Sequence, residues 1–263
     1  MNGTYDPLYL FIDGEWIGAR ERETASVVNP ATRKELGRVP LATTADLDRA
    51  LSATQPAFNA WRTTFPNERA RILKRGADLM RDRAEHIATV MTLEEGKPLA
   101  ESRDEVLRAA DYFEWFAEEA KRIDGRVVPA NRPGVQQLVK RQAIGPVAAF
   151  TPWNFPAITP ARKLAAALAA GCSVIIKPGE ESPATALALA RALDDAGLPK
   201  GVLQVVFGVP DDVSRHLIAS PVVRKVTFTG SVPIGRLLWA RAAEGVKPIT
   251  LELGGHAPVL VFA

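Results

Sequence analysis

The chain has 263 residues, of which 47% are hydrophobic and 24% charged, with 19 glycines and 20 prolines. This composition is typical of one large or two small globular domains and excludes a disordered, collagen-like or coiled-coil chain. Lys and Arg number 33 against 30 Asp and Glu. Because the two signs are interleaved along the sequence, we expect no nucleic-acid-binding groove.

Cysteine, histidine and hydropathy patterns exclude further classes of protein. The single cysteine, Cys172, rules out an internal disulfide and a cysteine-based zinc site. The three histidines show no metal-ligand spacing, so no metal site is predicted. The longest apolar run, 164–176, is shorter than a membrane span, and acidic residues stand where a signal peptide would be basic. We therefore expect a cytoplasmic protein with no membrane partner.

The first part of the chain is predicted to be mostly helical after a short hairpin. Asp13-Gly14 is a hairpin turn signal between weakly alternating residues. Thr43 followed by Asp46 resembles a capping box, and Pro66 suits the first turn of a longer amphipathic helix. The predicted elements are a hairpin over 8–18 and helices over 43–58, 66–95 and 106–116.

A two-stranded arm is predicted next. Two β-prone runs, 127–129 and 135–139, flank the turn sequence Asn131-Arg132-Pro133-Gly134. An isolated hairpin is only marginally stable in water. We therefore expect the arm to pack either on a partner subunit or on later sequence.

From residue 145 onward strands and helices alternate. This alternation is typical of a parallel sheet with crossover helices on its faces. We therefore predict an α/β fold, preceded by the helical region and the arm, with ligands at the carboxyl ends of the strands. The predicted strands are 147–151, 173–177, 202–207, 225–229 and 250–253, and the predicted helices are 162–170, 184–196, 211–219 and 232–243.

Two strand ends carry polar residues in rigid turns. Prolines flank Asn154 and would fix its amide as a donor to a developing oxyanion; the alternative is an asparagine that closes a turn. Trp153 beside it would form an aromatic floor for a cofactor, or else belong to the core. Lys177 and Glu180 straddle a tight turn and would grip a diol such as a ribose, or else form an exposed surface ion pair.

Two later strand ends add weaker signals. Gly230-Ser231 opens a helix, and such an N-terminus favours a pyrophosphate, although Gly-Ser helix starts are common and the G-x-G-x-x-G fingerprint is absent. Glu252 stands between leucines, where desolvation would raise its pKa toward that of a general base, unless the carboxylate reaches solvent past the two glycines that follow. Cys172 is interpreted as a small buried hydrophobe rather than a nucleophile.

Five short motifs stand at or near these strand ends: TPWNFP at 151–156, AAGC at 169–172, KPGE at 177–180, FTGS at 228–231 and LELGG at 251–255. In this order they resemble the aldehyde dehydrogenase superfamily, and the set is specific although each motif alone is not. The similarity extends over essentially the whole chain and looks greatest to the succinate-semialdehyde dehydrogenase group. The resemblance implies a Rossmann-like sheet and the NAD(P)-dependent oxidation of an acidic semialdehyde to the carboxylate.

The resemblance also implies roles for the candidate residues. Asn154 would supply the oxyanion-hole amide, Glu252 would be the general base, and Lys163 would belong to the inner proton relay. Arg162 would meet the substrate carboxylate, which suits a planar guanidinium. NAD is the expected cofactor, with NADP as the alternative, because Glu180 would repel a 2′-phosphate. The expected cofactor-binding residues are Lys177 and Glu180 at the ribose, Trp153 and Ser231 near the pyrophosphate, and Gly230 and Leu253.

One departure limits what the resemblance implies. The family's nucleophilic cysteine lies a few dozen residues beyond LELGG in a separate catalytic domain, whereas this sequence ends at Ala263 and Cys172 is not that residue. We therefore expect an N-terminal part that is inactive alone, from a homodimeric or homotetrameric enzyme acting on a small-molecule aldehyde. An inactive dinucleotide-binding or assembly fragment is the alternative. The expected divisions are an NAD(P)-binding domain at 1–125 and 145–256, an oligomerisation arm at 126–144, and the start of a missing catalytic domain at 257–263.

Overall fold

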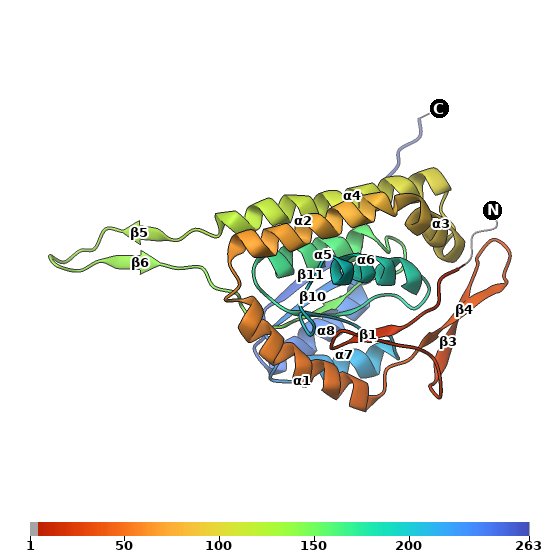
Figure 1. The fold of residues 1–263 in the computed structure, drawn as a ribbon, viewed down its shortest axis with the longest axis horizontal. Coiled ribbons are helices and arrows are strands. Elements are labelled where there is room, and N and C mark those ends of the chain that lie inside the picture. The colour runs from red at the N-terminus through yellow and green to blue at the C-terminus, as the bar shows by residue number, and fades with distance from the viewer. Residues whose placement is uncertain (1–4, 263) are drawn as a thin grey trace.

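A computed structural model describes residues 5–262 and contains one large sheet between two layers of helices (Figure 1). Residues 1–4 of the expected domain 1–125, and Ala263 of the expected segment 257–263, lie outside the described residues. Residues 254–262 contain no helix or strand, and the apolar side chains of 259–262 are exposed. The expected domain boundaries stay a prediction.

The large sheet has seven strands in the order β11-β10-β7-β8-β9-β1-β2. All neighbours from β11 to β9 are parallel, whereas β1 and β2 are antiparallel additions at one edge. The two central strands β7 and β8 are buried at every residue, as expected where helices cover both faces. The predicted α/β fold is confirmed. The strands are β1 (Leu10–Ile12), β2 (Glu15–Ile17), β7 (Val147–Phe150), β8 (Val174–Lys177), β9 (Leu203–Val205), β10 (Lys225–Gly230) and β11 (Ile249–Leu253).

Helices form a layer on each face of the sheet (Figure 1). On one side α5 and α6 are packed beneath α2, α3 and α4, and on the other side lie α1, α7 and α8. No helix in the described part of the chain is long and apolar enough to cross a membrane. The helices are α1 (Thr44–Trp61), α2 (Pro66–Asp82), α3 (Ala84–Glu95), α4 (Leu99–Glu119), α5 (Ile158–Ala169), α6 (Pro183–Asp195), α7 (Pro210–Ala219) and α8 (Val232–Glu244).

The start of α1 is as predicted from the sequence, but one predicted helix is divided into α2 and α3 in the structure. The capping box is present, since Thr43 and Asp46 each accept a hydrogen bond from the other's backbone nitrogen. The prediction of one continuous helix over 66–95 is wrong, because Arg83 leaves the helical conformation with φ −102° and ψ 9°. Its guanidinium pairs with Asp195 of α6 at 2.7 Å, and α3 then packs against α4 and α6.

A second hairpin, β3 (Thr24–Val28) with β4 (Glu35–Pro40), was not predicted. Its turn begins at Asn29, whose side-chain oxygen accepts backbone hydrogen bonds from Ala31 at 2.9 Å and Thr32 at 3.1 Å. Asparagine stabilises turns in this way, so Asn29-Pro30 was the available signal for it.

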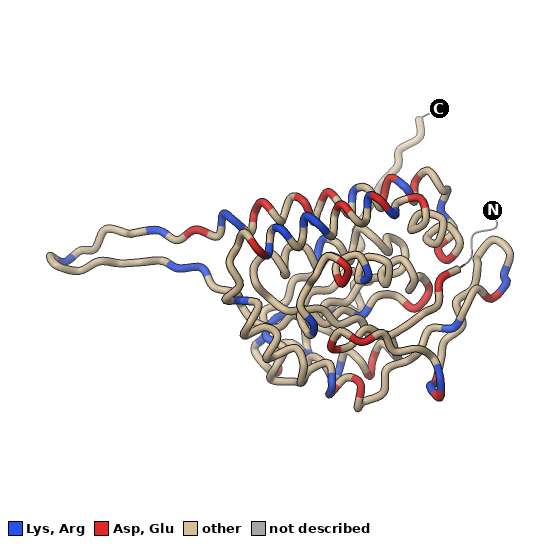
Figure 2. Tube along the Cα trace, viewed as in Figure 1, with Lys and Arg blue, Asp and Glu red and all other residues tan. Residues whose placement is uncertain are grey.

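The predicted arm exists, and it projects away from the body of the protein (Figure 1). Its strands are β5 (Arg126–Val128) and β6 (Gln137–Val139), paired antiparallel. Apolar side chains are exposed on it, with Val127 at 69% and Leu138 at 60% exposure. Elsewhere acidic and basic residues are mixed, but every charged residue over 126–144 is basic (Figure 2). Within the described part of the chain the side chains of Val127 and Leu138 thus remain largely uncovered.

Candidate active site

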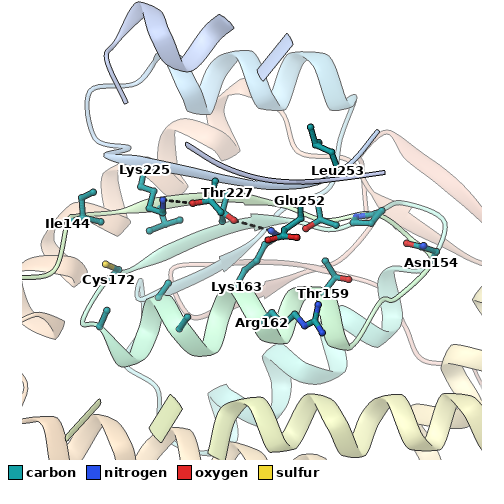
Figure 3. A pocket seen from close by; sticks show the side chains of 18 of the residues that line it. Ile144, Asn154, Thr159, Arg162, Lys163, Cys172, Lys225, Thr227, Glu252 and Leu253 are labelled. Atoms are coloured by element: carbon teal, nitrogen blue, oxygen red, sulfur yellow. Dashed lines mark hydrogen bonds between the residues drawn. The ribbon is translucent and has the colours of Figure 1, made fainter. Parts of the chain in front are cut away.

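A pocket of about 850 Å³ lies between α5 and the strands β10 and β11 (Figure 3). It contains seven of the ten residues predicted to form the site, and the other three, Lys177, Glu180 and Ser231, lie outside its lining. No group of three or more His, Cys, Asp or Glu side chains within 5–262 is arranged to hold a metal ion. The seven are Trp153, Asn154, Arg162, Lys163, Gly230, Glu252 and Leu253.

The loop 151–156 enters the pocket at the carboxyl end of β7. The side chain of Asn154 lines the pocket, while its backbone carbonyl accepts a hydrogen bond from the amine of Lys97 at 2.9 Å. The same amine lies 4.4 Å from the centre of the Phe155 ring. Trp153 is 48% exposed, so the alternative of a core tryptophan is wrong. The loop is thus fixed through its backbone, which leaves the Asn154 amide free to face a ligand.

Glu105 on α4 anchors this loop from behind. Its carboxylate pairs with Lys97 at 2.6 Å and accepts hydrogen bonds from the backbone nitrogens of Ala157 at 2.9 Å and Ile158 at 3.1 Å. These nitrogens open α5, where a carboxylate satisfies unpaired donors and complements the helix dipole. Lys97 and Glu105 were not among the predicted residues. The available signal was a glutamate within the apolar stripe of an amphipathic helix.

A polar stripe runs along one face of β10 and β11 toward α5. In register, Thr227 pairs with Thr250 and Thr229 with Glu252. From α5, the amine of Lys163 donates to Thr227 Oγ1 at 3.0 Å (Figure 3). Burial lowers the pKa of Lys163 to about 8, against a smaller opposing effect of the Glu252 carboxylate.

Glu252 lines the pocket, but the prediction that its carboxylate is desolvated is wrong. The residue is exposed, because β11 is an edge strand and the chain that follows it covers nothing. The structure agrees with the alternative, in which the carboxylate reaches solvent past Gly254 and Gly255. The side chain still points into the pocket, on the same side as Lys163 (Figure 3).

Arg162 lines the pocket beside Lys163. Its guanidinium carbon lies 5.0 Å from the centre of the Tyr112 ring on α4, a cation–π contact. Arg162 is exposed, so the guanidinium is open to a ligand while one face rests on the ring. The arrangement suits recognition of an anion.

The Lys177–Glu180 pair lies at the next strand end along the sheet. Lys177 is 6% exposed, and its amine lies 2.5 Å from the Glu180 carboxylate, which also accepts from the Gly208 nitrogen at 3.1 Å. The alternative of an exposed surface pair is therefore wrong. The turn packs closely on the neighbouring loop, because a Cβ on Gly179 would lie 3.1 Å from the Trp153 nitrogen.

The start of α8 lies next to Leu253, outside the lining of the pocket. Ser231 is the residue before the helix and is exposed, and no side chain caps the backbone nitrogens there. A Cβ on Gly235 would meet the Leu253 side chain at 2.6 Å, so glycine lets α8 approach β11. The helix N-terminus is thus open, as an anion-binding site requires.

Cys172 lies at the opposite end of the pocket from Asn154 (Figure 3). It is 3% exposed, and burial raises the pKa of its thiol. A buried thiol with a raised pKa is a poor nucleophile. The interpretation of Cys172 as a buried apolar residue is confirmed.

Comparison with known proteins gives the family. A family model described as "Aldehyde dehydrogenase family" matches residues 16–263. A 4-(hydroxymethyl)benzenesulfonate dehydrogenase of Comamonas testosteroni is 52% identical, over 96% of this chain and 53% of the relative. A glutarate-semialdehyde dehydrogenase of Pseudomonas aeruginosa is 47% identical, over 96% of this chain and 52% of the relative.

Solved structures agree with the sequence comparison. The crystal structure of a succinate-semialdehyde dehydrogenase from Burkholderia pseudomallei matches with a TM-score of 0.94 and 46% identity, over 97% of this chain and 53% of that one. The chain thus spans about half the length of the relatives it matches. The resemblance inferred from the five motifs is confirmed. Since the family model covers nearly all of the sequence, the chain belongs to the aldehyde dehydrogenase family.

Proposed function

We propose that this chain serves the NAD(P)-dependent oxidation of an aldehyde to the carboxylate. We further propose that the aldehyde carries an acid group, as succinate semialdehyde does. The observation that carries the proposal is the convergence of Asn154, Glu252, Lys163 and Arg162 on one pocket in a chain of this family. An amide donor, a carboxylate, an amine and a guanidinium are the groups that this chemistry uses.

Each side chain has a distinct task in the proposed reaction. The Asn154 amide donates a hydrogen bond to the aldehyde oxygen, which gains negative charge when a nucleophile adds to the carbonyl carbon. Glu252 accepts a proton from the water that releases the acid product. Lys163 lies close enough for the Glu252 charge to act on its pKa, so it is placed to stabilise the carboxylate and exchange protons near it.

The residues at the strand ends fit a dinucleotide. Thr151 Oγ1 is buried there and has no hydrogen-bond partner within 5–262, so a polar ligand is favoured at this edge. Lys177 and Glu180 would hold the ribose, with Trp153, Gly230, Ser231 and Leu253 nearer the pyrophosphate. When bound, the dinucleotide supplies a hydride acceptor. NAD is preferred in this proposal, because the Glu180 carboxylate would repel the 2′-phosphate of NADP.

The acid group of the substrate is assigned to Arg162. The relatives named above act, by their names, on a benzenesulfonate, on glutarate semialdehyde and on succinate semialdehyde, each of which carries a sulfonate or carboxylate. Arg162 lies in the pocket with its guanidinium oriented by Tyr112. Two parallel N–H groups of the guanidinium can donate hydrogen bonds to two oxygens of a carboxylate or of a sulfonate.

The second candidate is a dinucleotide-binding or assembly part without activity of its own. The position of Cys172, buried and far from Asn154, favours it for the 263-residue chain taken alone. The exposed apolar side chains of the arm support assembly into a homodimer or homotetramer, through a partner strand laid along β5 or β6.

Calorimetric titration of the 263-residue chain with NAD+ and with NADP+ tests the cofactor assignment. We expect saturable binding of at least NAD+, and absence of binding to both would overturn it. Activity is tested on the complete product of the gene, whatever its length, with succinate semialdehyde and NAD+. Asn154→Ala should lower kcat by roughly 10²–10³-fold, as loss of an oxyanion donor does elsewhere. An unchanged kcat in that variant would contradict the assigned role.

A further inference from the structure

Lys163 and Lys225, which line the same pocket, differ from Lys97 and Lys177 in their partners, because each donates to a threonine hydroxyl. Lys97 and Lys177 each lie within 2.6 Å of a glutamate carboxylate. The amine of Lys163 instead donates to the neutral hydroxyl of Thr227 at 3.0 Å. A hydroxyl brings no opposite charge, so it does less than a carboxylate to keep an amine protonated.

Charged groups on three elements act on the pKa of this amine. Glu252 on β11 favours its protonated form, whereas Lys225 on β10 and the neighbouring Arg162 on α5 oppose that form. Burial opposes it most strongly, and the pKa of Lys163 falls from an ordinary 10.5 to about 8. Near neutral pH, Lys163 is therefore present partly as the neutral amine, which is the nucleophilic form.

Lys163 and Arg162 are adjacent in sequence and line the same pocket (Figure 3). Tyr112 supports the guanidinium from the side of α4. A short molecule whose acid group binds Arg162 would lie in the same pocket that the Lys163 amine lines. This proximity raises the effective concentration of an aldehyde at the nitrogen.

We propose that Lys163 forms an imine with short aldehydes that carry an acid group, with Arg162 binding that group. The inference rests on the substrate class of the proposed function. The nitrogen lone pair attacks the carbonyl carbon, and a proton moves from nitrogen to the carbonyl oxygen. The resulting carbinolamine loses water and leaves a C=N bond, with Glu252 in the pocket to transfer protons. No electrons are gained or lost overall.

The imine has a consequence for the reaction. It removes the free amine beside Glu252 and occupies the pocket with the substrate's own carbon chain. An enzyme that contains this chain would then be inhibited slowly by its own class of substrate, more strongly as the pH rises toward 8.

Trapping with cyanoborohydride tests the proposal on the 263-residue chain, because hydride addition makes the imine a stable secondary amine. The chain is incubated with succinate semialdehyde or with butanal, a neutral aldehyde of the same carbon number, then digested and analysed by mass spectrometry. We expect Lys163 to gain the mass of the aldehyde less one oxygen atom. It should be labelled at least about tenfold faster by succinate semialdehyde than by butanal, a difference worth about 1.4 kcal/mol.

Two controls make the assignment specific. Lys225, in the same pocket, should be labelled far less than Lys163, and its label should not depend on Arg162. Arg162→Gln should bring the ratio of the labelling rates by succinate semialdehyde and by butanal close to one, while circular dichroism and thermal unfolding show that the fold is retained. The ratio is the readout because loss of the Arg162 charge also acts on the pKa of Lys163 and so changes both rates together. Labelling of Lys163 should also rise between about pH 7 and 9.

Every outcome of this experiment decides the proposal. Absence of label at Lys163 in the folded wild-type chain overturns it, as does equal labelling of all lysines. Equal labelling by both aldehydes overturns the part assigned to Arg162. These failures differ from failure of the proposed function, which the dinucleotide titration and the activity of the complete gene product test without reference to the amine.

Discussion

The amine of Lys97 donates a hydrogen bond to the backbone carbonyl of Asn154, 57 positions further along the chain, at 2.9 Å. The same amine pairs with the buried Glu105. Glu105 in turn binds the first backbone nitrogens of α5. The helical region before the arm thus determines where the candidate oxyanion donor lies, although none of its residues was predicted to belong to the site.

Replacing Glu105 with Gln should destabilise the chain. The change removes the nearer of the two carboxylates beside the Lys97 ammonium, since Glu95 lies at 3.9 Å, and it weakens the acceptor for two backbone donors at α5. Breaking a buried ion pair by removing one partner costs about 3–5 kcal/mol. We expect a loss of that order in the free energy of unfolding, measured by urea denaturation.

Glu101→Gln is the matched control for that substitution. Glu101 lies one turn earlier on the same helix α4 and is exposed. Glu101→Gln should change the free energy of unfolding by no more than about 0.5 kcal/mol, as is usual for surface positions. Equal effects of the two substitutions would show that Glu105 does not anchor the loop.

Replacing Glu180 with Gln should shift the preference between dinucleotides. The proposed repulsion of a 2′-phosphate depends on the negative charge, which glutamine lacks. We expect the ratio of the Kd for NADP+ to the Kd for NAD+ to fall by on the order of tenfold, about 1.4 kcal/mol, in calorimetric titrations.

Glu181 provides the control for this prediction, since it is the next residue and is exposed. Glu181→Gln removes an equal charge and should leave the ratio nearly unchanged. If both variants, or neither, alter the ratio, Glu180 does not select the dinucleotide.

The sheet was predictable because its strands and helices alternate with clear periods and turn residues. The helix break at Arg83 was not, because apolar residues keep one helical face across it, and the break depends on packing against α6. The β3–β4 hairpin was missed because only Val27, Val39 and Pro40 are buried in its two strands, so apolar alternation is weak. Local sequence thus predicts elements better than the junctions that tertiary contacts create.

The position of Asn154 and Glu252 in the pocket was predictable, because Asn154 follows the end of β7 and Glu252 lies near the end of β11. The environment of Glu252 was not, because its leucine neighbours in sequence say nothing about an uncovered edge strand. Lys97 and Glu105 were missed for a related reason. Lys97 contacts Asn154, 57 positions away, and Glu105 contacts Ala157, 52 positions away, so only the folded chain brings these residues together.

Glu94 should make stability depend on pH. Its buried carboxylate accepts hydrogen bonds from the Tyr5 hydroxyl and from Ala184 and Thr185 at the start of α6. Burial raises the pKa of Glu94 from 4.5 to about 7. Between these values the folded chain holds a proton that the unfolded chain releases, so the free energy of unfolding falls as the pH rises through this window.

Glu94→Gln tests this linkage, because glutamine does not titrate. We expect the free energy of unfolding to fall less between about pH 4.5 and 7 in the variant than in wild type. The measurement is the unfolding free energy of both proteins at several pH values, compared as a difference at each pH. Glu101→Gln should keep the wild-type dependence. Parallel curves for wild type and Glu94→Gln would contradict the raised pKa.

The 263-residue chain should not oxidise aldehydes by itself. Covalent catalysis needs a thiolate beside the oxyanion donor. The chain's one cysteine, Cys172, is buried at the far end of the pocket from Asn154, and burial raises the pKa of its thiol. We therefore expect no steady formation of NADH from succinate semialdehyde and NAD+ by a preparation of verified mass, even where titration shows bound dinucleotide. Steady turnover that Cys172→Ser abolishes would make Cys172 the nucleophile and overturn the assignment of the pocket.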